Sequence, residues 1–153
     1  MKQVPFELDC LGYGAPKRLA VTLYRSATGL DFYSGTRPTH AKPGYNAIRV
    51  QGQAVVASDG SKTRPLRLYY NAAKKRYFTI AHPSTIETVR DAGAAQQGIL
   101  GNIYVSPVPG GTALVSYQKG DDVALGSTPD DKSELAQLGY KVLRIEGYLL
   151  PPR

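Results

Sequence analysis

Residues 23–34 read LYRSATGLDFYS and residues 68–79 read LYYNAAKKRYFT, so one pattern of apolar, aromatic and polar positions returns 45 residues later without a gap. The same shift places Pro38 on Pro83. Each stretch has a strand-like run, a turn of small and polar residues and a second strand-like run, which is the pattern of a β-hairpin. A fixed internal period of this kind predicts a repeated structural unit.

Two further observations extend the period to three copies. A third hairpin follows with one residue deleted, at VSYQ (115–118) and DVA (122–124). Downstream of each hairpin a second block also recurs, as IRVQG (48–52), QGILG (97–101) and LRIEG (143–147). Because both blocks keep their order, we expect a single domain over residues 1–153, built from three units at about 18–63, 64–110 and 111–153.

Helix signals separate the hairpin from the last strand in units two and three. In STPDD (127–131), Thr128 is a candidate N-cap, followed by a proline suited to the first helical position and by acidic residues. Gly139 suits the position after the helix end. The sequence STIE (84–87) offers a similar capping box. The matching segment of unit one, residues 38–44, is short and contains a second proline, which predicts a loop.

These signals predict a fold that is all-β to α+β. A single hairpin cannot bury its apolar face alone, so the three units are expected to close around a shared core. We predict a three-repeat, pseudo-threefold, β-trefoil-like domain with short helices in units two and three. An irregular three-bladed assembly of mixed α+β units is the alternative.

The composition is typical of a soluble globular domain with many turns, since Gly (16) and Pro (11) are frequent in a chain of 153 residues. Cys10 is the one cysteine, which excludes an intrachain disulfide. No apolar run resembles a signal peptide or approaches the roughly 18 residues of a membrane span. We therefore expect no membrane insertion, and a protein that is cytoplasmic, non-classically secreted or the mature form of a secreted protein.

The positive charge is concentrated in unit two. The net charge is +7, and residues 61–90 carry seven Lys/Arg against Glu87 alone. Such a basic face could attract nucleic acid, acidic glycans or an acidic protein. A solvated strand face is the plainer explanation, so no specific nucleic-acid binding is expected.

Two motifs of unit three resemble a known repeat. The segments STPDDKSELAQLGY (127–140) and RIEGYLLP (144–151) are similar to a tandem repeat of 45–50 residues, of pattern LYRxY, DHFYTT, AGY and EGxxxY, found beside secreted bacterial and fungal hydrolases. The resemblance implies an ancillary carbohydrate- or cell-wall-binding module. This sequence lacks the histidine of that pattern and has Asp31, Arg76 and Asp122 in its place.

Comparison of the three copies separates a common apolar set from a variable set. Residues beside the common positions are expected to point outward, because strand side chains alternate between two faces. The common apolar positions are interpreted as the shared core: Leu23, Leu68 and Val115; Phe32, Tyr77 and Val123; Val50, Ile99 and Ile145.

The outward positions of units one and two combine aromatic rings with a charged group. A ring stacks on the apolar face of a sugar, while a carboxylate or guanidinium forms paired hydrogen bonds with adjacent hydroxyl groups. Unit three has Ser116 and Ala124 at the aromatic positions and is not expected to bind. We predict two ligand sites, formed by Tyr24, Asp31 and Tyr33 in unit one and by Tyr69, Arg76 and Phe78 in unit two.

The sequence contains little that favours catalysis. His40 and His82 are the only imidazoles, both in Pro-flanked loops, and neither a nucleophile elbow nor a zinc-binding spacing is present. We predict no enzyme, no cofactor and no metal.

Two hypotheses about function remain. One is a lectin-like module that binds a glycan or a cell-wall polysaccharide, and the other is a protein-binding module, such as an inhibitor or immunity protein, that uses an exposed loop or the basic face of unit two.

Overall fold

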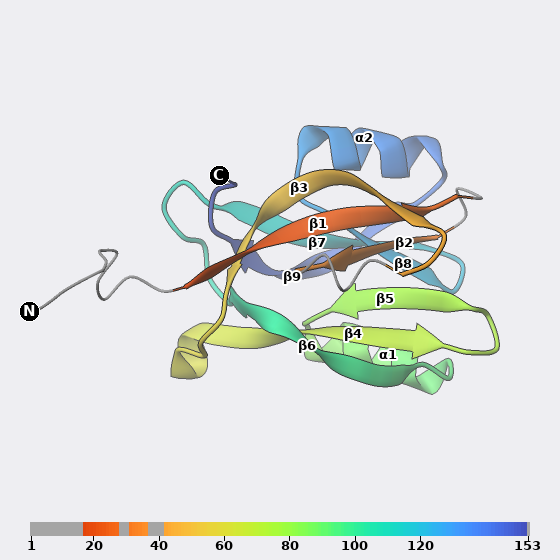
Figure 1. Cartoon of the computed structure of the whole chain (residues 1–153), viewed down its shortest axis with the longest axis horizontal. Coiled ribbons are helices and arrows are strands. Elements are labelled where there is room, and N and C mark those ends of the chain that lie inside the picture. The colour runs from red at the N-terminus through yellow and green to blue at the C-terminus, as the bar shows by residue number, and fades with distance from the viewer. Residues whose placement is uncertain (1–16, 28–30, 37–41, 153) are drawn as a thin grey trace, which may run out of the picture.

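The computed structural model describes residues 17–27, 31–36 and 42–152 (Figure 1). Each unit contributes three strands, and units two and three add a helix before the last strand. The strands are β1 (Arg18–Ser26), β2 (Phe32–Gly35), β3 (Tyr45–Val55), β4 (Thr63–Asn71), β5 (Arg76–Ile80), β6 (Ala95–Tyr104), β7 (Thr112–Lys119), β8 (Asp122–Gly126) and β9 (Lys141–Leu149). The helices are α1 (Pro83–Asp91), α2 (Pro129–Gln137) and a short 3₁₀ turn, η2 (Gly60–Lys62).

The strand order is the same in all three units. The first strand of each unit lies in the middle, and it pairs antiparallel with the second strand on one side and with the third on the other. Units one and two also share their hairpin register, since Tyr24 pairs with Tyr33 and Tyr69 pairs with Phe78. The hairpins predicted from the sequence are therefore present.

The third strands connect the units. β3 meets β6 at Val55 and Asn102, β6 meets β9 at Tyr104 and Tyr148, and Gln53 bridges to Leu150 just beyond β9. The described strands thus form one open antiparallel sheet. The prediction of an all-β to α+β fold is confirmed, whereas the strand pairing does not confirm a β-trefoil.

The register of the third hairpin differs from the sequence alignment by one residue. Tyr117 pairs with Ala124 and so occupies the place of Tyr24 and Tyr69, where Ser116 was expected. The cause is the turn, because two residues separate β7 from β8, while four separate β4 from β5. The prediction that unit three has no aromatic residue at this position of its first strand is therefore wrong.

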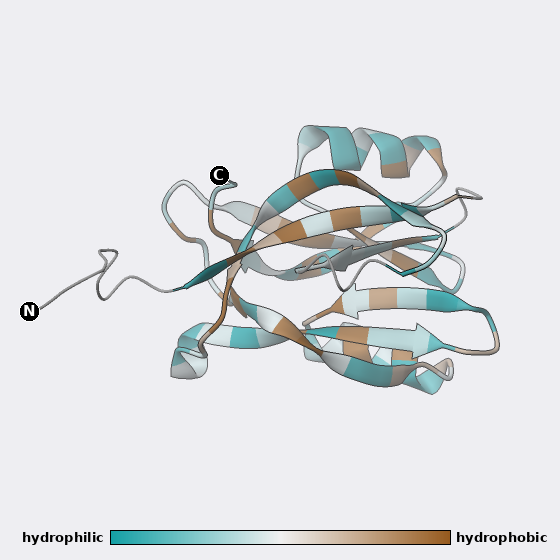
Figure 2. Ribbon diagram, viewed as in Figure 1, coloured by the Kyte–Doolittle hydropathy of each residue, from teal (hydrophilic) through white to brown (hydrophobic). Residues whose placement is uncertain are grey.

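The core uses equivalent residues of all three units. Val21, Leu66 and Leu114 on the first strands are fully buried, as are their counterparts Ala54, Ile103 and Leu149 on the third strands. Figure 2 shows these strands with brown, apolar segments, while helix α2 presents mostly polar residues.

Part of the predicted core is exposed. Val50, Ile99 and Ile145 have exposed fractions of 40%, 56% and 46%, so their placement in the core is wrong. The alternation of the third strands instead buries the next residue of each block, whether or not it is apolar. These inward residues are Gln51, Leu100 and Glu146.

Both predicted helices are confirmed, but only one begins as expected. Thr128 caps α2 in a capping box with Asp131. In α1 the N-cap is His82, whose side chain accepts a hydrogen bond from the backbone N–H of Ser84, so the box predicted for STIE (84–87) is wrong. Most of the loop predicted for unit one lies outside the described residues. No helix in the described part of the chain is long and apolar enough to cross a membrane.

A buried carboxylate joins unit three to the helix of unit two. Glu146 on β9 is fully buried, and its Oε1 accepts hydrogen bonds from the backbone N–H groups of Ala81 and His82, both at 2.8 Å. Its Oε2 accepts from the hydroxyl groups of Thr85 at 2.5 Å and Ser116 at 2.9 Å. The carboxylate therefore lies at the N-terminus of α1, where the helix dipole favours negative charge.

A similar contact joins units one and three, but there the helix supplies the carboxylate and the strand supplies the neutral side chain. Gln51 stands at the Glu146 position, and its Nε2 donates to Asp131 on α2 at 3.0 Å. Asp131 stands at the Thr85 position, and it also accepts from the backbone N–H groups of Ser127 and Thr128. Each contact thus contains one buried carboxylate, supplied by the strand in one case and by the helix in the other.

Candidate functional site

The aromatic residues predicted to bind sugar are buried. Tyr24 is 7% exposed and Tyr69 is 3% exposed, and their cross-strand partners Tyr33 and Phe78 are covered almost completely. The Tyr24 and Tyr33 rings stack on each other with centroids 5.2 Å apart. The expectation that these rings point into solvent is wrong, because other elements cover the second face of each hairpin as well as the first.

The charged members of the predicted sites do come together, but with each other. Asp31, Arg76 and Asp122 stand at or just before the start of the three second strands, which lie against one another. Arg76 Nη1 is 3.0 Å from Asp122 Oδ2. Asp31 Oδ2 accepts hydrogen bonds from the Tyr45 hydroxyl group and from the backbone N–H of Tyr77. We call Asp31, Arg76 and Asp122 the axial triad.

The axial triad holds more negative charge than its hydrogen bonds satisfy. Asp31 and Asp122 are each 5% exposed, and the Oδ1 atom of each is buried without a hydrogen-bond partner among the described residues. Burial, reinforced by the nearby charge of Asp31, raises the pKa of Asp122 to about 6, and the Tyr140 hydroxyl and Arg76 offset only part of this. Burial also raises the pKa of Asp31.

Acidification from pH 7 to pH 4 is expected to stabilise the domain through Asp122. Its native pKa of about 6 exceeds the usual value of 3.8, so between these values the native state binds more protons than the unfolded state. The free energy of unfolding therefore rises as the pH falls, by up to about 3 kcal/mol from this group. Urea unfolding of wild type and Asp122→Asn across this pH range measures the effect. The stability gained at low pH should be smaller in Asp122→Asn than in wild type and unchanged in the exposed control Asp130→Asn. Equal pH slopes in all three proteins would contradict the assignment.

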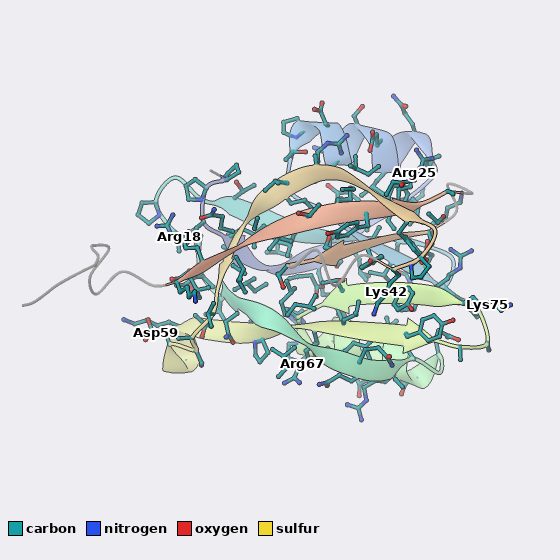
Figure 3. The ribbon with its side chains drawn as sticks, viewed as in Figure 1. Arg18, Arg25, Lys42, Asp59, Arg67 and Lys75 are labelled. Atoms are coloured by element: carbon teal, nitrogen blue, oxygen red, sulfur yellow. The ribbon has the colours of Figure 1, made fainter. Side chains whose placement is uncertain are left out.

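A hollow with a volume of about 730 Å³ lies on the surface of unit two. Strand β4, helix α1 and the start of β6 line it, and Figure 3 shows Arg67 on this outer side of the unit. We call it the unit-two cleft. Its polar lining consists of Arg64, Arg67, Tyr69, Ser84, Glu87, Arg90, Asp91 and Gln96.

The side chains of the unit-two cleft are held partly in place. Arg64 Nη1 donates to the backbone carbonyl of Glu146 at 3.0 Å, and Arg67 Nη1 donates to Gln96 Oε1 at 3.1 Å. The hydroxyl of Tyr69 lies 3.5 Å from the same Gln96 oxygen. Tyr69, although buried, is thus part of the cleft wall, and it is the one predicted site residue that contributes to the cleft.

The arginines of the cleft are particular to unit two. The strand registers place Leu19 and Thr112 at the position of Arg64, and Thr22 and Val115 at the position of Arg67. The equivalent hollow of unit one, lined by Thr22, Tyr24 and residues 45–50, has a volume of about 510 Å³ and a single arginine. The basic run in residues 61–90 signalled the arginines, but nothing in the sequence placed Gln96 or Asp91 beside them.

Comparison with family models, with characterised proteins and with solved structures gives no match. The resemblance to the repeat found beside secreted hydrolases therefore stays a prediction.

Proposed function

We propose that this protein is a carbohydrate-binding module whose ligand occupies the unit-two cleft. The proposal rests on the observation that the side chains of this cleft differ from those at the equivalent positions of the other two units. The hydrophobic core is shared by all three units, whereas Arg64 and Arg67, which line the cleft, have no arginine at the equivalent positions of the other two units. Polar residues that the packing of the fold does not require, gathered in a concave surface, favour ligand binding.

The donors and acceptors of the cleft suit a polyhydroxylated ligand. Guanidinium groups only donate hydrogen bonds, and the carboxylates of Glu87 and Asp91 only accept them when ionised. Gln96 can do both. A sugar hydroxyl donates and accepts at once, so a ring with several hydroxyl groups matches this mixed set better than a purely apolar or purely anionic molecule does. The proposal places one site in unit two, in place of one stacking site in each intact repeat.

We further propose that the three units surround a pseudo-threefold axis. The second strands β2, β5 and β8 lie against one another, and single bridges join β3 to β6, β6 to β9, and Gln53 of β3 to Leu150 just beyond β9. Each unit also keeps its own set of three strands, which fits the three-bladed alternative better than a trefoil barrel. On this arrangement the axial triad lies near the axis and the unit-two cleft lies on the periphery.

A protein partner is the second candidate. It is favoured by the exposed apolar side chains of the third strands, Ile99, Val142 and Ile145, whose exposed fractions are 56%, 63% and 46%. Two of them, Val142 and Ile145, lie on the same strand, and contiguous exposed apolar surface is typical of protein contact surfaces.

A glycan array probed with the labelled protein tests the proposal. We expect binding to a limited set of oligosaccharides, and loss of that binding in Arg67→Ala, because the variant removes a donor from the cleft without opening the core. Lys141→Ala on β9 is the matched control that removes one exposed positive charge elsewhere. Absence of binding to every glycan, with the protein shown to be folded, would leave the protein partner as the leading candidate.

A further inference from the structure

We infer that the ligand of the unit-two cleft is an anionic glycan whose carboxylate or sulfate group is bound by Arg64, Arg67 and Arg90. The inference rests on the proposed function and adds the chemical class of the ligand.

The arginine side chains of the cleft carry positive charge that no ion pair within the described residues neutralises. The ion pairs between described residues involve Arg49, Lys74 and Arg76, and none involves an arginine of the cleft. Arg64 and Arg67 are held by neutral oxygen atoms, of a backbone carbonyl and of a glutamine. These contacts leave the positive charge of both guanidinium groups available to an anion.

The three arginines approach the cleft from two walls. Arg64 lies near the start of β4 and Arg67 near its middle, and both line the cleft, while Arg90 comes from α1 in the other wall. A bound anion can therefore be contacted from a strand and from a helix. Guanidinium groups bind carboxylate and sulfate oxygens in pairs, which gives both affinity and orientation.

Two carboxylates of the cleft distinguish a glycan from a nucleic acid. Glu87 and Asp91 line the same cleft, and neither forms an ion pair with a described residue. Two unpaired carboxylates repel a continuous phosphate backbone, but they accept hydrogen bonds from sugar hydroxyl groups. Each unit of an acidic sugar carries one anionic group together with hydroxyl groups, and the cleft offers guanidinium donors for the first and carboxylate acceptors for the second.

Isothermal titration with a matched pair of probes tests the inference. Trigalacturonic acid carries the carboxylates, and its methyl ester keeps the hydroxyl groups without the charge. Wild type should bind the acid at least about tenfold more tightly than the ester, in keeping with the strength of charge-assisted hydrogen bonds. A sulfated galactose trisaccharide, in a third arm, tells a sulfate ligand from a carboxylate ligand.

Variants assign the effect to the cleft. Arg67→Ala and Arg90→Ala should each weaken binding of the preferred anionic probe by about tenfold or more, and Arg67→Lys should recover only part of the loss because lysine lacks the paired donors. Glu87→Gln should weaken binding of the ester, because an amide is a weaker acceptor for a sugar hydroxyl group, and should weaken binding of the acid less, because it also removes a negative charge near the anion. Lys132→Ala on α2 controls for removal of one positive charge, and circular dichroism confirms that each variant is folded.

The outcomes separate this inference from the proposed function. Equal affinity for acid, sulfated and ester probes, all lost in Arg67→Ala, would overturn the anionic class and leave the carbohydrate site standing. Failure to bind any of the three probes, together with a blank glycan array, would overturn both. Tighter binding of a single-stranded DNA oligonucleotide than of the anionic sugars, at physiological salt, would replace the glycan by a nucleic acid.

Discussion

Glu146→Ala is expected to cost about 3 to 5 kcal/mol of the free energy of unfolding, enough to unfold much of a marginally stable domain. The variant removes the acceptor of two backbone N–H groups, of Ala81 and His82, and of the hydroxyl groups of Thr85 and Ser116. These donors are left in a site without access to water, where each unsatisfied group carries its full desolvation penalty. The contact also joins units two and three, so its loss weakens the assembly of the repeats. Urea unfolding followed by circular dichroism measures the change.

The Glu146–Thr85 contact and the Gln51–Asp131 contact place the carboxylate on opposite sides, on the strand in the first and on the helix in the second. This difference allows a rescue experiment. Glu146→Gln alone should be destabilising, because a neutral amide accepts weaker hydrogen bonds from the N–H groups of Ala81 and His82 and turns a donor toward the hydroxyl groups of Thr85 and Ser116. Glu146→Gln combined with Thr85→Asp reproduces the arrangement of Gln51 and Asp131, in which the helix supplies the carboxylate. The double variant should therefore be more stable than the sum of its single variants predicts. Asp130→Asn on the exposed side of α2 is the control, and strictly additive effects would refute the equivalence of the two contacts.

Tyr69→Ala is expected to destabilise the domain by about 3 to 5 kcal/mol, as large-to-small changes of buried aromatic residues do. The ring belongs to a buried cluster with Phe78, Ile80 and Val89, and it is 3% exposed. Tyr69→Phe should cost much less, because it keeps the ring and removes only the hydroxyl group near Gln96. Equilibrium unfolding in urea distinguishes the two variants.

Tyr69→Ala also distinguishes a ring that packs in the core from a ring that stacks on a ligand at the surface. A solvent-exposed platform can be truncated to alanine without unfolding the protein, and its loss is seen only in binding. If Tyr69→Ala is as stable as wild type, the buried placement of the ring is contradicted. Tyr24→Ala and Tyr117→Ala probe the equivalent positions, and we expect both to behave as Tyr69→Ala does.

The repeat made much of the fold predictable. The gap-free shift of 45 residues located two hairpins, and the segments between Pro and Gly located two helices, of which α2 also has the predicted N-cap. The register of the third hairpin was missed because a turn can lose two residues while a strand retains its pairing. A residue that aligns in sequence, such as Ser116, can then lie one position away from its structural equivalent.

The candidate site was harder to predict, for two physical reasons. Alternation along a strand predicts one buried and one exposed face only where a single face is covered, and here Tyr24 and Tyr69 are buried although they neighbour the core positions Leu23 and Leu68. The unit-two cleft depends in addition on how helix α1 packs beside β4. That packing brings Arg90 and Arg67 into one cleft from different elements, and no local pattern encodes it.

The most direct test of the carbohydrate site is amide chemical-shift mapping during titration with the oligosaccharide that binds best on the array. The account predicts that the shifted signals cluster on β4 around Arg64 and Arg67, on α1 from Ser84 to Asp91, and at Gln96. Signals of the equivalent hollow of unit one, around Thr22 and Asn46, should remain in place. Shifts confined to unit one, to the axial triad or to the exposed third strands would contradict the assignment of the unit-two cleft.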